Sequence, residues 1–154
     1  MNRIESVREV VDQVLSSVPD PTERRAGYVH LYGVAQACAL LASKRGEDVE
    51  LAVIAGVLHD IHSYSTGDPK DHASKGAVMA REILSGLQMF TGHEIEKICG
   101  AIHYHSNKDG KHAPFVEVLI DADVMQHSLY NPLFNVFPHE RQRYDALRRE
   151  FSFL

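Results

Sequence analysis

The segment of residues 51–64 constrains the fold most, because an apolar helix there runs directly into ionisable side chains. Its apolar residues recur every three or four positions, which predicts a helix in the core. His59, Asp60 and His62 follow at the end of this apolar run. Burying a carboxylate and imidazoles is costly unless another group binds them, and a divalent metal accepts both ligand types. The alternative is that His59 and Asp60 cap the end of the helix and face water.

The composition indicates one globular domain spanning residues 1–154. The chain is 44% hydrophobic and 24% charged, and its length allows a substantial core. A net charge of -5 gives no indication of a surface for nucleic acid or anionic membranes. No apolar run reaches the ~18 residues of a membrane span, and the first residues lack the apolar core of a signal peptide. Cys38 and Cys99 lie in apolar helical patterns, so we expect reduced thiols in a cytoplasmic protein.

Helical periodicity, with no alternating strand pattern, predicts an all-α domain of six or seven helices. The expected helices are residues 3–18, 22–45, about 49–62, 72–84, 92–105, 114–125 and about 139–151. Turn-forming residues predict loops at 63–70 and 107–114. We expect the core of the domain to span residues 22–130, with the first and last helices flanking it.

Ligand-type side chains interrupt the apolar helical faces at six places. In chain order these are His30, His59, Asp60, His72, His105 and Asp123. The chain has ten histidines, and seven of them fall between His59 and His112. A lone histidine on an apolar face, such as His30, is usually a core residue rather than a ligand. The whole series in all-helical surroundings resembles the HD superfamily of metal-dependent hydrolases, named for its His-Asp doublet, over roughly residues 22–130.

The resemblance implies a first metal held by His30, His59, Asp60 and Asp123. Asp121 competes with Asp123 for the last position, because the two carboxylates point about 200° apart on a helix and only one can face the site. Family members with Ala-Asp at this position favour Asp123.

Additional histidines in some branches of the family hold a second metal, which the aspartate of the doublet bridges to the first. His72 and His105 fit those positions here, with His103 as a rival to His105. The branch that this pattern resembles includes the symmetrical diadenosine tetraphosphatases. The resemblance therefore implies two divalent ions, and Fe, Mn, Ni, Mg and Zn all suit a site of histidines and carboxylates.

The resemblance predicts a metal-dependent phosphohydrolase acting on a small phosphorylated metabolite, in particular a nucleotide. Two metals about 3.5–4 Å apart can deliver a hydroxide to phosphorus at neutral pH. Asp60, His62 and Lys108 are the candidate catalytic residues, with His62 as a proton donor or substrate contact and Lys108 as a phosphate contact. The alternatives are a di-iron oxygenase and a non-catalytic metal- or ligand-binding module.

The expected partners are small molecules, without a nucleic-acid polymer or a membrane. Residues 131–138 are apolar and irregular, and we expect them to pack over the core. The apolar residues 133–137 of this segment could alternatively serve a homodimer.

Overall fold

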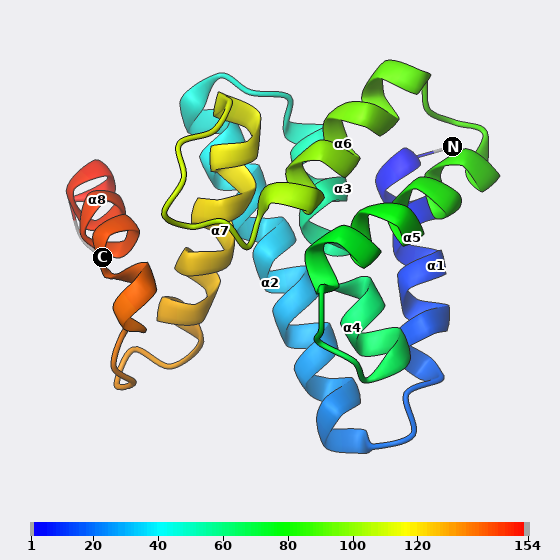
Figure 1. The fold of residues 1–154 in the computed structure, drawn as a ribbon, viewed down its shortest axis with the longest axis horizontal. Helices are drawn as coiled ribbons and strands as arrows, with labels where there is room; N and C mark the ends of the chain where they lie inside the picture. The colour runs from blue at the N-terminus through cyan, green and yellow to red at the C-terminus, as the bar shows by residue number, and fades with distance from the viewer. Residues whose placement is uncertain (1, 153–154) are drawn as a thin grey trace.

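The computed structural model describes residues 2–152, and all regular elements in that range are helical (Figure 1). They are α1 (Arg3–Ser16), α2 (Pro21–Arg45), α3 (Val49–Leu58), α4 (Ile61–Thr66), α5 (His72–Leu87), α6 (Gly92–Tyr104), α7 (Pro114–Tyr130), the 3-10 turn η1 (Pro138–Glu140) and α8 (Arg141–Phe151). The prediction of an all-α fold is confirmed. None of these helices is both long and apolar enough to cross a membrane.

Side-chain caps fix where the helices begin. The carboxylates of Asp20 and Asp48 accept hydrogen bonds from backbone N–H groups in the first turns of α2 and α3. Thr91 and Glu94 form a capping box at the start of α6. Gly46 ends α2 in the left-handed conformation, with φ of 72°. These local signals explain why most predicted boundaries lie within two residues of the observed ones.

The helix expected to continue to about residue 62 ends instead at Leu58, so this prediction is wrong. Asp60 leaves helical geometry, with φ of -112° and ψ of 14°, and α4 then begins in a new direction. α4 also covers the first half of the segment 63–70 that we expected to be a loop. Hydroxyls of Ser65 and Thr66 donate to the carbonyl of His62 within α4. This break gives the described residues eight α-helices, one more than the upper end of the expected range.

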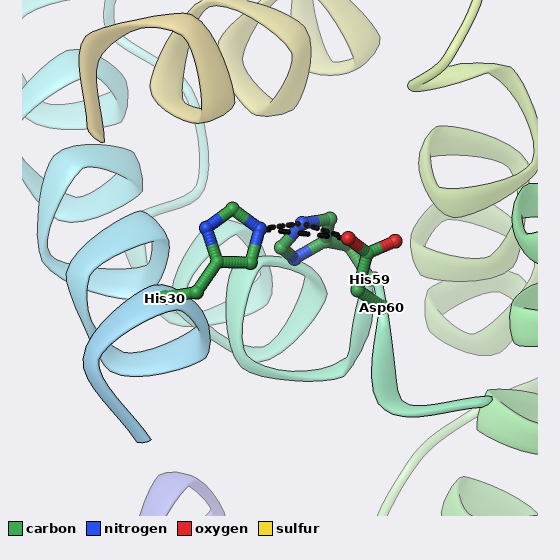
Figure 2. A group of neighbouring side chains, drawn as sticks. All are labelled: His30, His59 and Asp60. Atoms are coloured by element: carbon green, nitrogen blue, oxygen red, sulfur yellow. Dashed lines mark hydrogen bonds and ion pairs between the residues drawn. The ribbon is translucent and has the colours of Figure 1, made fainter. Parts of the chain in front are cut away.

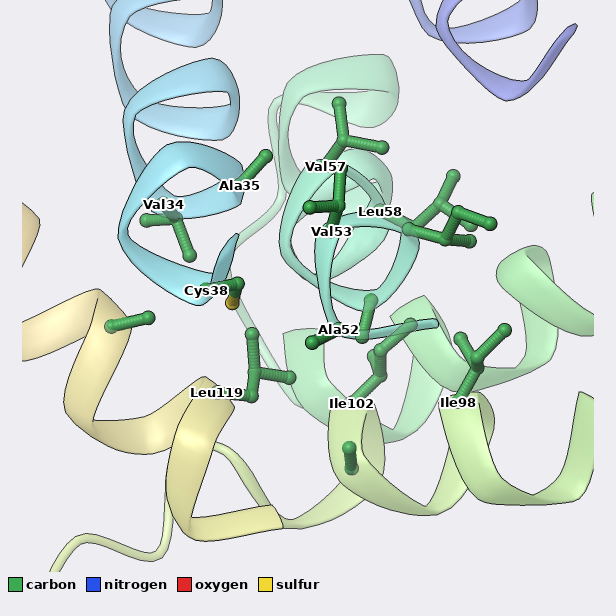
Figure 3. Close-up of a cluster of buried hydrophobic side chains, with 14 of the residues drawn as sticks. Val34, Ala35, Cys38, Ala52, Val53, Val57, Leu58, Ile98, Ile102 and Leu119 are labelled. Carbon is green, nitrogen blue, oxygen red and sulfur yellow. The ribbon is translucent and has the colours of Figure 1, made fainter. Parts of the chain in front are cut away.

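The core lies where α2, α3, α6 and α7 meet (Figure 3). Gly56 allows α2 and α3 to approach closely, because a Cβ at this position would lie 2.8 Å from the Ala35 Cα. Cys38 and Cys99 are buried free thiols, and burial raises the pKa of each. Both cysteines therefore serve as core residues rather than as nucleophiles.

The first and last helices lie on opposite sides of the long helix α2 (Figure 1). Arg3 ties α1 to the body of the molecule through ion pairs with Glu50 and Glu94. Leu147 of α8 is buried, and Arg45 of α2 pairs with Glu150 at a distance of 2.7 Å. α8 is thereby packed against the end of the domain that carries α7.

Candidate metal centre

The six predicted ligand residues converge in the interior from five different parts of the chain. His30 lies on α2, His59 directly follows α3, His72 begins α5, His105 directly follows α6, and Asp123 lies on α7. Asp60 occupies the break between α3 and α4. Figure 2 shows His30, His59 and Asp60 pointing toward one another.

Asp60 lies at the middle of the cluster and divides it into two halves. Its Oδ2 atom is 3.5 Å from His30 Nε2 and 3.4 Å from His59 Nε2. Its Oδ1 atom is 3.6 Å from His72 Nε2 and 3.3 Å from His105 Nε2. Each carboxylate oxygen therefore faces its own pair of imidazoles.

Asp123 completes the half that contains His30 and His59. Its Oδ1 atom is 3.6 Å from His30 Nε2 and 3.8 Å from His59 Nε2. Three overlapping groups have ligand atoms within 4.8 Å of one another: His30 with His59 and Asp60, His30 with Asp123 and His127, and Asp60 with His72 and His105.

Backbone carbonyls orient the imidazoles. The Nδ1–H groups of His59, His105 and His72 donate to the carbonyls of Gly56, Ile102 and Pro69, at 2.8, 2.7 and 3.1 Å. Because a carbonyl can only accept, these bonds fix the proton on Nδ1 and turn each Nε2 atom toward the centre. The Ser106 hydroxyl also contacts His72 Nε2, at 2.9 Å.

Electron-rich atoms crowd together in the centre, and two of them lack a partner. His30 Nε2 and His59 Nε2 lie only 3.1 Å apart. Asp60 Oδ1 and Asp123 Oδ1 are buried without a hydrogen bond. Such groups are costly to bury, and a cation shared among them removes the cost. The geometry and the donor set therefore fit divalent metal ions.

The electrostatics keep both carboxylates ionised. Burial raises the pKa of Asp60, but His59, His105 and His30 outweigh this effect and hold the pKa well below its usual range. Burial likewise raises the pKa of Asp123, and Lys108 with the nearby imidazoles more than reverses it. The centre therefore offers two anionic ligands at neutral pH.

The surroundings shift the pKa values of the histidines in opposite directions. Burial lowers the pKa of His59, which favours the neutral imidazole that a metal requires. Burial also lowers the pKa of His30 and His105, but Asp60 and Asp123 outweigh burial and raise both values above the ordinary one.

The structure separates the residues that competed for the same positions. Asp121 points away from the centre, with its carboxylate 2.8 Å from Arg45 Nη2 and 2.9 Å from Arg143 Nη1. His103 is exposed, and its ring lies edge-on against Tyr104. The positions inside the cluster belong to Asp123 and His105.

The two further catalytic candidates have different surroundings. Lys108 reaches the centre, but its ammonium lies 2.6 Å from both Asp123 Oδ2 and Glu140 Oε1, so its charge is already paired. Among residues 2–152, no hydrogen bond or ion pair joins His62 to the cluster, and its Nδ1 is buried without a partner. The structure therefore does not bring His62 into the centre.

Sequence reasoning missed His127 and Glu140, which both contact residues at the centre. His127 Nε2 lies 3.4 Å from Asp123 Oδ1, and its Nδ1 lies 3.0 Å from the buried carboxylate of Glu140. The spacing of four residues between Asp123 and His127 places both on one face of α7 and could have indicated this contact. Gln126 was also missed, and its Oε1 atom lies 2.8 Å from His30 Nδ1.

Two openings lead to the centre from different sides. A cavity of about 430 Å³ is lined by His30, Asp60 and His127 together with apolar and aromatic residues. A second cavity of about 330 Å³ reaches Asp60 and His72 past Glu23 and Pro69. A small molecule can therefore reach Asp60 from either side.

Comparisons with known proteins find a matching family model, a curated relative and a solved structure with a similar fold. A family model described as HD domain matches residues 27–131. Ribonuclease Y of Lawsonia intracellularis is 32% identical over 95 residues, which are 60% of this chain and 16% of that protein. The chain thus spans less than a fifth of the length of this curated relative.

A solved structure described as a "predicted HD superfamily hydrolase", from an uncultured Thermotogales bacterium, has the same fold. It matches with a TM-score of 0.62 and 23% sequence identity, over 96% of this chain and 88% of that chain. The family match and the histidine–aspartate cluster together support a metal-dependent hydrolase. Because the family model covers more than half of its residues, the chain belongs to the HD domain family.

Proposed function

We propose that this protein is a metal-dependent phosphohydrolase with two divalent ions at the centre. His30, His59, Asp60 and Asp123 hold one ion, and Asp60, His72 and His105 hold the other. The observation that carries the proposal is the position of Asp60, whose two oxygens face separate imidazole pairs. A carboxylate placed in this way suits a ligand that bridges two ions.

A pair of bound ions supplies Lewis-acid polarisation of phosphoryl oxygens and a hydroxide at neutral pH. The protein's own residues hold the proposed metal ligands in position. The backbone carbonyls behind His59, His72 and His105 fix the ligand rings, and Lys108 with Glu140 fixes the position of Asp123. Because Lys108 is already paired, the metals rather than a lysine carry most of the phosphate recognition.

We propose a small phosphorylated metabolite, in particular a nucleotide, as the substrate. The family match supports hydrolytic chemistry, and the name of the ribonuclease relative indicates that a related domain occurs in a protein acting on phosphodiesters. The net charge of -5 disfavours a long polyanion such as RNA and leaves a small nucleotide as the better candidate.

Hydrolysis of a panel of substrates, with the products identified by chromatography, tests this proposal. The panel contains nucleoside monophosphates, dinucleoside polyphosphates, a nitrophenyl phosphodiester and an RNA oligonucleotide, each with metal-loaded and chelator-treated protein. We expect metal-dependent hydrolysis of a small nucleotide or ester and little hydrolysis of RNA. Asp60→Asn is expected to reduce the rate by about a hundred-fold or more.

Asp109→Asn is the matched control, because Asp109 is exposed in the loop after α6 and its replacement is expected to leave the rate unchanged. Hydrolysis that persists in Asp60→Asn contradicts the proposal. Iron-dependent oxygen consumption without hydrolysis of any of these substrates contradicts it as well and favours the oxygenase.

A further inference from the structure

The larger cavity at the centre has two chemically different ends. At the inner end, His30, Asp60 and His127 present polar groups of the metal centre. At the outer end, the last residue of α7 and the segment after it present aromatic side chains to solvent: Tyr130 is 61% exposed, Phe134 67% and Phe137 54%. Exposed aromatic groups that line a cavity continuous with a reaction centre indicate a binding surface.

A row of rings crosses the cavity from one wall to the other. Tyr64 lies 6.4 Å from His30, His30 stacks on His127 at 5.2 Å with an interplanar angle of 11°, and Phe137 lies 6.0 Å from His127, all measured between ring centroids. Tyr64 is tilted by 47° from His30, and Phe137 stands at 83° to His127. The rings therefore form differently oriented aromatic walls, against which a planar group can pack.

We propose that this cavity binds the planar aromatic part of the substrate, a nucleobase or comparable aryl group, while the phosphate lies at the metal centre. The proposal rests on the phosphohydrolase function above and narrows its substrate class. The residues that select the aromatic group are Phe134 and Phe137, which lie outside the region that the family model matches.

Few charged side chains line the cavity, which favours an uncharged group at its outer end. Its lining within the described residues includes no lysine or arginine, and its only acidic group is Asp60 at the inner end. The outer end therefore offers no cation for a second phosphate. Its volume of about 430 Å³ suits one nucleoside-sized group.

The smaller cavity, of about 330 Å³, leads to the same carboxylate, Asp60. It shares Asp60 and Tyr64 with the larger cavity, and its lining also includes His72, Glu23 and Ser63. An aromatic group in the larger cavity leaves this more polar opening free for water and for the released alcohol or phosphate.

Calorimetric titration of Mn²⁺-loaded protein tests the proposal with three probes: adenosine 5′-monophosphate, ribose 5-phosphate and adenosine. Ribose 5-phosphate retains the phosphate without the base, whereas adenosine retains the base without the phosphate. We expect the monophosphate to bind about ten-fold more tightly than ribose 5-phosphate, since stacking of a base on aromatic side chains contributes this much. The double variant Phe134→Ala/Phe137→Ala is expected to lose this preference and to bind ribose 5-phosphate as the wild type does.

Leu133→Ala is the matched control, because Leu133 is 92% exposed in the same segment and does not line the cavity. This variant is expected to keep the preference for the base. Circular dichroism checks that each variant is folded, which we expect because the replaced side chains are largely exposed.

Equal affinity for the monophosphate and ribose 5-phosphate, or a preference that survives in the double variant, overturns the proposal. It is also overturned if the wild type is dimeric by light scattering and the double variant is monomeric, because residues 133–137 then cover a second copy. If ribose 5-phosphate does not bind but adenosine binds and loses affinity in the double variant, the aromatic site stands and the phosphohydrolase function fails.

Discussion

Asp60, Asp123 and Glu140 are buried or largely buried carboxylates whose charge is balanced by different partners. Lys108 balances Asp123 and Glu140 through two contacts of 2.6 Å. His30 and His105 face Asp60, and this carboxylate raises the pKa of both rings, which favours protonated imidazoles beside it in the metal-free protein. A metal ion takes the place of these protons when it binds.

Removal of the Lys108 ammonium is expected to destabilise the fold. Lys108→Met leaves Asp123 and Glu140 buried without their cation, and breaking such a pair costs about 3–5 kcal/mol in the free energy of unfolding. Urea unfolding of the chelator-treated protein measures this loss. Adding Glu140→Gln to Lys108→Met is expected to recover part of it.

Lys111→Met serves as the control, since Lys111 is exposed and its replacement is expected to change stability by less than about 0.5 kcal/mol. If Lys108→Met unfolds at the same urea concentration as the wild type, Lys108 does not support the buried carboxylates and is free to act on substrate.

Metal affinity is expected to rise with pH. Because the pKa values of His30 and His105 are raised above 6.5, both rings retain protons at and above that pH, and a metal must displace them. Each displaced proton increases the apparent affinity by up to about ten-fold per pH unit until the pH passes the raised pKa. Calorimetric titration between pH 6 and 8, in two buffers of different ionisation enthalpy, measures the released protons. An affinity that does not change with pH would contradict this account.

At the scale of secondary-structure elements, the break between α3 and α4 positions the doublet. His59 ends α3, and its carbonyl lies beside α5, where a Cβ on Gly76 would come within 2.9 Å of it. Glycine at this position lets α5 approach the doublet, and His72 at the start of α5 reaches Asp60 as a result.

Gly76→Ala is therefore expected to move α5 away from Asp60. We expect a loss of about 1–3 kcal/mol in the free energy of unfolding and weaker binding of the metal that His72 and His105 hold. Gly86→Ala lies in the same helix with open space around it, and it is expected to stabilise the protein by about 0.5–1 kcal/mol. Urea unfolding and metal titration of both variants check this. If the two variants have the same free energy of unfolding and the same metal affinity, the close approach at Gly76 does not position α5.

The sequence allowed prediction of the helices and of the residues that meet at the centre, because both depend on local patterns. Capping residues such as Asp48 and Thr91 define boundaries, and polar residues such as His30 are conspicuous on apolar helical faces. The break at Asp60 was not predictable, because apolar periodicity continues through Ile61. The contact between His127 and Glu140 joins two segments whose packing is a tertiary property.

At the scale of the whole molecule, residues from 30 to 123 must be brought together before the centre exists. The packed helices α2, α3, α6 and α7 provide this scaffold, and the centre lies at the ends or inner faces of these helices. The segment after α7 then adds Glu140 behind the centre and aromatic residues beside it. The packed helices thus hold the proposed metal ligands, and the segment after α7 lines the cavity proposed to bind the substrate.

Metal analysis of the purified protein tests the dinuclear centre most directly. The wild type is compared with His72→Ala/His105→Ala, and His93→Ala/His103→Ala is the control because both of these histidines are exposed. We expect two metals per chain in the wild type and in the control, and one in the His72→Ala/His105→Ala variant, since His30, His59, Asp60 and Asp123 remain. One metal per chain in all three proteins, or none after incubation with divalent ions, would contradict the proposed two-metal site.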